Sequence, residues 1–224
     1  LVKLNGMDTD AYILWANLYL KDKNPKEAIA VLNNALSQGV NDIDVYLVTG
    51  YAYSADGKDD EALKFYNKAL EVKSDEPKTH FYLGSFYEKI GKTELAVKEF
   101  RETIKLDPGF ADAYNYLGYM FADEGANLDE AITLIKKALE LDPDNGAYLD
   151  SLGWAYYKSG RIDEALAEIE KASKVVPDDP TIRDHLGDIY FKNGSKDNAI
   201  AEWKASLKLD PSQERVKEKL KKAK

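Results

Sequence analysis

The chain of 224 residues contains no cysteine, which excludes disulfide bonds, a thiolate nucleophile and thiolate metal sites. Histidine is almost as scarce, since His80 and His185 are the only two and stand far apart. Neither lies in the spacing of a Ser-His-acid triad or a two-histidine-carboxylate site. His80 falls on an apolar helical stripe, which favours a core role. We therefore expect a protein that is not an enzyme, with no catalytic residues, no cofactor and no metal.

Positive charge and long apolar runs are also in short supply. The chain has 31 basic and 40 acidic residues, a formal net charge of −9 and a pI near 4.9. Such a chain does not attract phosphate backbones, so we expect no nucleic-acid partner. An uncharged apolar-rich run such as "AYILWANLYL" at 11–20 is too short to cross a bilayer. With 44% hydrophobic and 11% aromatic residues, the chain can still build a core.

The sequence is rich in internal repetition. Six times a small residue stands three positions before an aromatic one, and an alanine follows the small residue after twelve or thirteen positions. The small residues are Ala16, Gly50, Gly84, Gly118, Gly153 and Gly187, and the alanines are Ala28, Ala62, Ala96, Ala131, Ala165 and Ala199. The predicted units are 9–42, 43–76, 77–110, 111–145, 146–179 and 180–213. Five units have equal length, and the fourth has one extra residue in the turn "DEGANLD".

The repeat pattern predicts a pair of helices in each unit. In "LDSLGWAYYKSGRIDEAL", Gly153 interrupts a strong helical stripe at a cost of about 1 kcal/mol relative to alanine. The second predicted helix presents Ala165 and Ile169 on its own stripe. We expect Gly153 to face Ala165, so that the two helix axes approach closely and larger neighbours fill the flanks.

These motifs resemble the tetratricopeptide repeat, and the resemblance extends over residues 9–213. A large residue, Leu-Gly, an aromatic residue and alanine recur in order, and a proline follows at Asp107-Pro108, Asp142-Pro143, Val176-Pro177 and Asp210-Pro211. Units one and two depart from the pattern, with Val40 and Ser74 in place of proline and Trp15-Ala16 in place of Leu-Gly. The resemblance implies an all-α fold, a right-handed α-solenoid of six helix-turn-helix units.

The two ends of the chain should differ. We expect 214–224 to form a C-terminal capping helix that docks through Val216 and Leu220 and exposes its lysines. At the other end, residues 1–8, "LVKLNGMD", fit the end of a preceding repeat. In that case unit one would be exposed on one side or available to another molecule.

Three motifs suggest chemistry but lack its full pattern. "GKT" at 91–93 has Phe86 where a phosphate-binding loop requires glycine. "DPDNGAYLDSLG" at 142–153 has Gly153 where a calcium loop requires glutamate. Adjacent acidic residues such as Asp163-Glu164 recur at the starts of second helices, where they suit the helix dipole. We interpret all three as turns or helix starts.

The resemblance implies that a second stripe of each first helix lines a concave groove. The candidate partner-binding residues are Tyr51, Tyr82, Asn115, Tyr119, Asp150, Trp154, Tyr157, Asp184, His185 and Asp188. We expect Trp154, Tyr119 and Tyr157 to be more exposed than Tyr82. In the last three units the groove positions carry aspartates and no lysine. Lys158 and Lys192 lie toward the rim. A basic ligand with apolar anchors is therefore predicted, and Asn115 is a candidate to bind its backbone.

Three functions remain open from the sequence: a non-catalytic protein-protein interaction scaffold with a groove, a structural module that self-associates through unit one, and an accessory domain of a larger protein. A clamp for a terminal carboxylate is not expected, because Asn17 and Lys78 are isolated. The blocks "GAYLDSLGWAYYKSG" and "PTIRDHLGDIYFKNG" are similar to C-terminal units of bacterial tetratricopeptide proteins, often associated with the envelope. That similarity favours a periplasmic or membrane-anchored setting and leaves the cytoplasm open.

Overall fold

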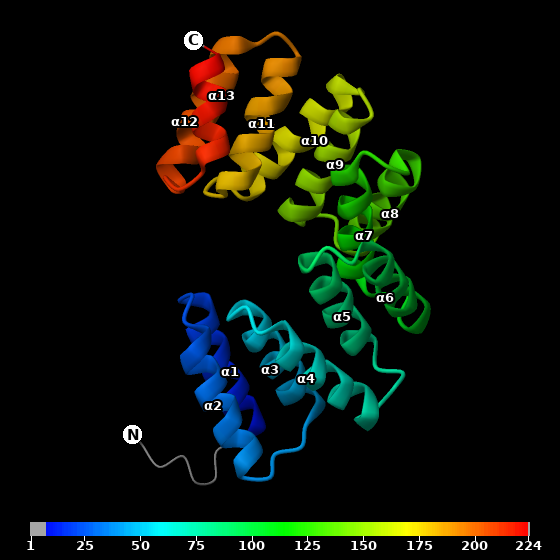
Figure 1. Ribbon diagram of the computed structural model, residues 1–224. Helices are drawn as coiled ribbons and strands as arrows, with labels where there is room; N and C mark the ends of the chain where they lie inside the picture. Colours follow the sequence, from blue (N-terminus) through cyan, green and yellow to red (C-terminus); the bar gives the residue numbers. More distant parts are fainter. Residues whose placement is uncertain (1–7, 224) are drawn as a thin grey trace. The chain divides into compact units, whose positions relative to one another are not determined.

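A computed structural model describes residues 8–223, which form thirteen α-helices and no strand (Figure 1). The predicted all-α repeat fold is therefore confirmed. None of the described helices has the length and apolar character that a bilayer-spanning segment requires. The helices are α1 (Thr9–Lys21), α2 (Pro25–Ser37), α3 (Ile43–Ala55), α4 (Asp59–Val72), α5 (Pro77–Lys89), α6 (Thr93–Leu106), α7 (Ala111–Glu124), α8 (Leu128–Leu141), α9 (Gly146–Lys158), α10 (Ile162–Val175), α11 (Pro180–Lys192), α12 (Lys196–Leu209) and α13 (Glu214–Lys222).

The chain divides into two compact units between Asp107 and Pro108. Unit 1 contains α1–α6 and unit 2 contains α7–α13. Within each unit the helices pair as antiparallel hairpins, and the first helix of each hairpin also packs on the first helix of the next. This arrangement places α7, α9 and α11 next to one another in unit 2.

Local sequence explains where these helices begin and end. Asn145 caps α9 through its side-chain oxygen, which accepts hydrogen bonds from the backbone N–H groups of Ala147 and Tyr148. Asp179 caps α11 in the same way, with Pro180 in the first turn. In the α9–α10 turn Gly160 has a φ of 80°, a left-handed conformation that glycine adopts without steric cost.

The α7–α8 turn contains the extra residue of the fourth unit. Gly125 has a φ of 69° and Asn127 a φ of 48°, so two residues of this turn are left-handed. Ala131 of α8 is nevertheless fully buried beside Gly118 of α7. The turn absorbs the extra residue while Ala131 keeps its contact with Gly118.

The predicted close approach at the repeat glycines is confirmed. A Cβ added at Gly153 would lie 3.2 Å from the Cβ of Ile169 and 3.3 Å from the carbonyl oxygen of Ala165. At Gly118 it would lie 2.6 Å from Cγ1 of Ile135 and 2.9 Å from the Ala131 carbonyl oxygen. The absence of a side chain at these glycines allows the helices to pack closely, and that contact offsets the low helix propensity of glycine.

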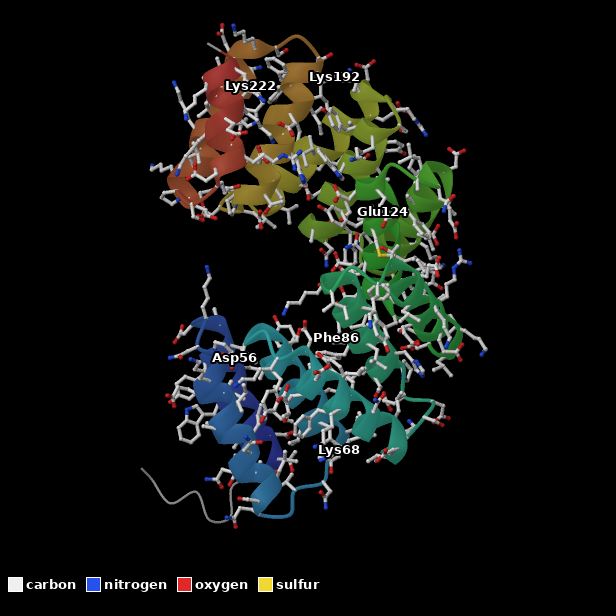
Figure 2. The ribbon with its side chains drawn as sticks, viewed as in Figure 1. Asp56, Lys68, Phe86, Glu124, Lys192 and Lys222 are labelled. Carbon is white, nitrogen blue, oxygen red and sulfur yellow. The ribbon has the colours of Figure 1, made fainter. Side chains whose placement is uncertain are left out.

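The C-terminal helix docks as the sequence predicts. Val216 is buried, and Leu220 packs beside Trp203 and Ala199 of α12. Lys222 at the end of α13 is exposed, as is Lys192 at the end of α11 (Figure 2). The expectation for residues 1–8 falls outside the described residues except for Asp8, which precedes α1.

Candidate functional site

A cavity of about 690 Å³ opens in unit 2 beside the first turns of α9 and α11. Asn115 and Tyr119 reach it from α7, and Asp150 and Ser151 reach it from α9. Three further aspartates line it: Asp142, Asp144 and Asp179. None of its described lining residues is lysine or arginine. The cavity is thus acidic, and it brings together three of the predicted site residues: Asn115, Tyr119 and Asp150.

Asp150 is paired with a buried histidine of the next hairpin. The Nδ1 atom of His185 lies 2.9 Å from one carboxylate oxygen of Asp150 and 3.1 Å from the other. Asp150 and His185 are each only 7% exposed. The sequence placed both residues on a solvent-exposed groove, and for His185 that expectation is wrong, because Asp150 and the ring of Trp154 enclose it. Asp150 keeps an edge on the cavity.

The expected exposure of Trp154 is also wrong. Its residue is 4% exposed, and its ring stacks on His185 at 4.2 Å and on Tyr157 at 5.0 Å between centroids. Its indole Nε1 donates a hydrogen bond to Asp123 at 3.3 Å. Trp154 therefore belongs to the interface between neighbouring hairpins. Tyr157 covers it and is half-buried, but it does not line the cavity.

Asp184 and Asp188 are bound by a lysine that the sequence interpretation missed. Lys219 of α13 lies 2.6 Å from Asp184 and 2.7 Å from Asp188, and Trp203 donates to Asp188 as well. Burial raises the pKa of Asp188 even though the hydrogen bond and charge of Lys219 oppose it. The expectation that no lysine accompanies these aspartates is wrong, because α13 packs across them. The sequence does contain a signal for this contact. Lys219 stands 35 residues after Asp184, just as His185 stands 35 residues after Asp150.

Asn115 is the buried polar residue of the cavity. It is 8% exposed, and its side-chain oxygen has no hydrogen-bond partner within the described part of the chain. An unpaired buried carbonyl oxygen costs about 1–3 kcal/mol, so a donor that reaches it is strongly favoured. Asn115 also lines the cavity.

Two candidate residues lie in unit 1. Tyr51 of α3 is half-exposed, and its ring meets that of Tyr82 of α5 edge-on at 6.4 Å between centroids. Tyr82 is partly buried against Tyr66. Their contact makes a small aromatic surface within unit 1, and their role in binding stays a prediction.

The charge of His185 should make the stability of unit 2 depend on pH. Burial alone lowers its pKa, but the charge and hydrogen bond of Asp150, with the charges of Asp184 and Asp188, raise the pKa above its ordinary value. A raised pKa contributes stability that is complete below the unfolded value of about 6.5 and is lost as pH rises through the folded value. Lys219 of α13 faces two of these carboxylates, Asp184 and Asp188.

We therefore expect urea unfolding to show stability that falls as the pH rises above about 6.5. His185→Gln should flatten this slope. His80→Gln is the comparison in unit 1: because Glu99 raises the pKa of His80 through a hydrogen bond, this substitution should flatten the pH dependence of unit 1 and leave that of unit 2 unchanged. Equal slopes for the wild type and His185→Gln would contradict the assignment.

Four family models match the chain. Three models described as "Tetratricopeptide repeat" match residues 83–146, 121–184 and 181–213, and one described as "TPR repeat" matches residues 50–91. A curated protein, the TPR repeat-containing protein PA4667 of Pseudomonas aeruginosa, is 47% identical over 45 residues. That match covers 20% of this chain and 8% of the relative, so the chain spans a small part of that protein's length.

Several solved structures share the fold. A chain of the APC/C hetero-tetramer Cut9-Hcn1 matches 95% of this chain with a TM-score of 0.83 and 19% identity, over 42% of its own length. Pseudomonas aeruginosa pilF matches 95% of this chain and 96% of its own at a TM-score of 0.73 and 18% identity. The protein TTC0263 of Thermus thermophilus matches 81% of this chain and 98% of its own at a TM-score of 0.69 and 23% identity. At these identities the structures support the fold alone. The sequence matches, the helical hairpins and the glycine contacts all agree. The chain belongs to the tetratricopeptide repeat family.

Proposed function

We propose that this protein is a non-catalytic scaffold that holds a segment of a partner protein along α7, α9 and α11 of unit 2. Repeats of this family generally mediate protein-protein interaction, and the family is generally non-catalytic. The observation that supports this site is the cavity of about 690 Å³, which is within the usual size of about 300–1,000 Å³ for ligand sites. It combines apolar side chains with a few convergent polar groups.

The rim of the cavity supports the binding of a peptide. Tyr116 is exposed and Tyr119 is half-buried, both on the same helix. On the far side, Val176 and Ile182 supply apolar surface. Tyrosine offers a large contact area at low conformational cost and is enriched at binding hot spots. A segment with one or two apolar side chains fits this combination.

A self-association module is the second candidate, and it has an observation of its own. Leu14 and Leu18 of α1 are 63% and 55% exposed. The corresponding residues one unit later, Val48 and Ala52 of α3, are buried in a core that includes residues of α1 and α2. Light scattering decides this alternative, because a single chain of 25.2 kDa would double in mass as a dimer.

A peptide-display selection on the full 224-residue chain tests the scaffold proposal. Selected peptides are measured by calorimetry against the wild type, Tyr119→Ala and Tyr114→Ala. Tyr114 is the matched control, because it lies on α7 but donates to the Pro108 carbonyl outside the cavity. We expect Tyr119→Ala to weaken binding about tenfold, or about 1.4 kcal/mol, and Tyr114→Ala to change it little. Failure to select any peptide, or equal affinities for both variants, would overturn the proposal.

A further inference from the structure

In unit 2, two successive pairs of neighbouring helices are joined by the same type of contact. His185 of α11 meets Asp150 of α9, and Lys219 of α13 meets Asp184 of α11. Both pairs are separated by 35 residues, so they occupy the same place in the repeat. In each pair the later helix supplies the basic group and the earlier helix supplies the acceptor. On α11 the two roles fall on consecutive residues: Asp184 is the acceptor for Lys219, and His185 is the basic group for Asp150.

The same register between α7 and α9 lacks a basic group. It places Ser151 opposite Asn115, once the extra residue in the α7–α8 turn is taken into account. Ser151 is short, and its hydroxyl donates to the carbonyl oxygen of Ala147 at 2.9 Å on its own helix. The side-chain oxygen of Asn115 is left without a partner among the described residues. Both residues line the acidic cavity. The cavity therefore lies where the other two pairs hold a basic group.

We infer that this cavity binds a lysine or arginine side chain of the partner segment, which completes the third pair by donating to Asn115 and to the carboxylate of Asp150. The inference rests on the proposed function, and it names the chemistry of the segment at one position. An ammonium group has three donors and a guanidinium five, and neither has an acceptor, which suits an environment of carbonyl and carboxylate oxygens.

The remaining charges of the cavity favour the same ligand. Asp142 accepts from Asn145 at 2.9 Å, and Asp179 accepts from the first N–H groups of α11. Their negative charge remains even though these bonds use part of their acceptor capacity. Asp144 is exposed at the mouth. A carboxylate or phosphate ligand would be repelled by the four aspartates of the lining, whereas a cation gains from all four.

A substitution at Ser151 can supply the missing basic group from within the chain. Ser151→Lys places a lysine at the position that Lys219 occupies in α13. Such a side chain would reach Asn115 and fill the cavity. Ser151→Ala is the matched control, since it removes the hydroxyl and leaves the cavity open. Asn115→Leu provides a second route, because it removes the acceptor and keeps a similar volume.

The probes are N-acetyl-arginine methylamide and its citrulline analogue, which has nearly the same shape but no charge. We titrate each into the isotope-labelled full chain and follow backbone amide signals by NMR. The arginine probe should bind the wild type and Ser151→Ala with shifts confined to amides around the cavity. Ser151→Lys and Asn115→Leu should weaken it at least tenfold, and added salt should weaken it as well. Equal shifts for arginine and citrulline, or undiminished binding to Ser151→Lys, would overturn the inference.

The display experiment separates this inference from the proposed function. If the selected peptides lack basic residues and bind Ser151→Lys normally, the cation site is wrong and the scaffold proposal stands. If the arginine probe binds as expected but no peptide depends on Tyr119, the cation site stands and the scaffold proposal fails. A thermal melt adds an independent measurement, since a lysine that satisfies Asn115 should leave the midpoint of Ser151→Lys equal to or above that of Ser151→Ala.

Discussion

Replacing Trp154 by alanine should lower the free energy of unfolding of unit 2 by about 3–5 kcal/mol. The ring is almost fully buried, and it stacks on His185 and Tyr157 between the α9 and α11 hairpins. Its removal leaves a void beside a buried histidine-aspartate pair and also frees the side chain of Asp123 from its indole bond. The measurement is hydrogen exchange by mass spectrometry on the full chain, with peptides of unit 1 as the internal reference.

Trp154→Phe is the matched control for this prediction. It keeps an aromatic ring against His185 and loses only the indole N–H and part of the volume. We expect a loss well below that of alanine, with protection in unit 1 unchanged for both variants. A cost under about 1 kcal/mol for Trp154→Ala would mean that the ring is on the surface, as the sequence alone suggested.

Replacing Gly118 by alanine should destabilise unit 2 by about 2 kcal/mol. Overpacking costs about 1–3 kcal/mol, and the better helix propensity of alanine returns up to about 1 kcal/mol. The new methyl group would lie 2.6 Å from Ile135 and 2.9 Å from the carbonyl oxygen of Ala131. The side chain of Ile135 can rotate, but the backbone oxygen cannot move unless α7 and α8 separate. We therefore expect the overpacking cost to lie near the upper end of its range, which leaves the net loss of about 2 kcal/mol.

Gly153→Ala is the comparison for Gly118→Ala. The same methyl group there would meet its nearest atoms at 3.2–3.3 Å, which a few tenths of an ångström of movement relieves. Urea unfolding of both variants should rank them in that order, with Gly153→Ala within about 1 kcal/mol of the wild type. If Gly153→Ala were the more destabilising variant, the larger side chains around each glycine, and not the distance between the two helices, would determine the cost of an added methyl group.

The fold was predictable because its determinants recur within each 34-residue unit. Gly153 and Ala165 are twelve residues apart, and the glycine, the alanine and the turn are all set by local spacing. The same reasoning placed the capping helix, since the apolar spacing of Val216 and Leu220 is visible in the sequence.

The site was only partly predictable, because burial there depends on the neighbouring hairpin. Asn115, Tyr119 and Asp150 do line one cavity, as their shared stripe predicted. The stripe could not show that His185 covers Trp154 from a position 31 residues further along. Nor could it show that Lys219 binds two aspartates, because the apolar spacing of its helix predicts docking only through Val216 and Leu220.

The left-handed pair of residues between α7 and α8 also has a practical use. Since that turn accommodates an additional amino acid while Ala131 keeps its contact with Gly118, its length is independent of the hairpin core. The polypeptide has no native thiol. A cysteine introduced at Ala126 would therefore accept a maleimide dye at a single known point, in the turn that follows α7.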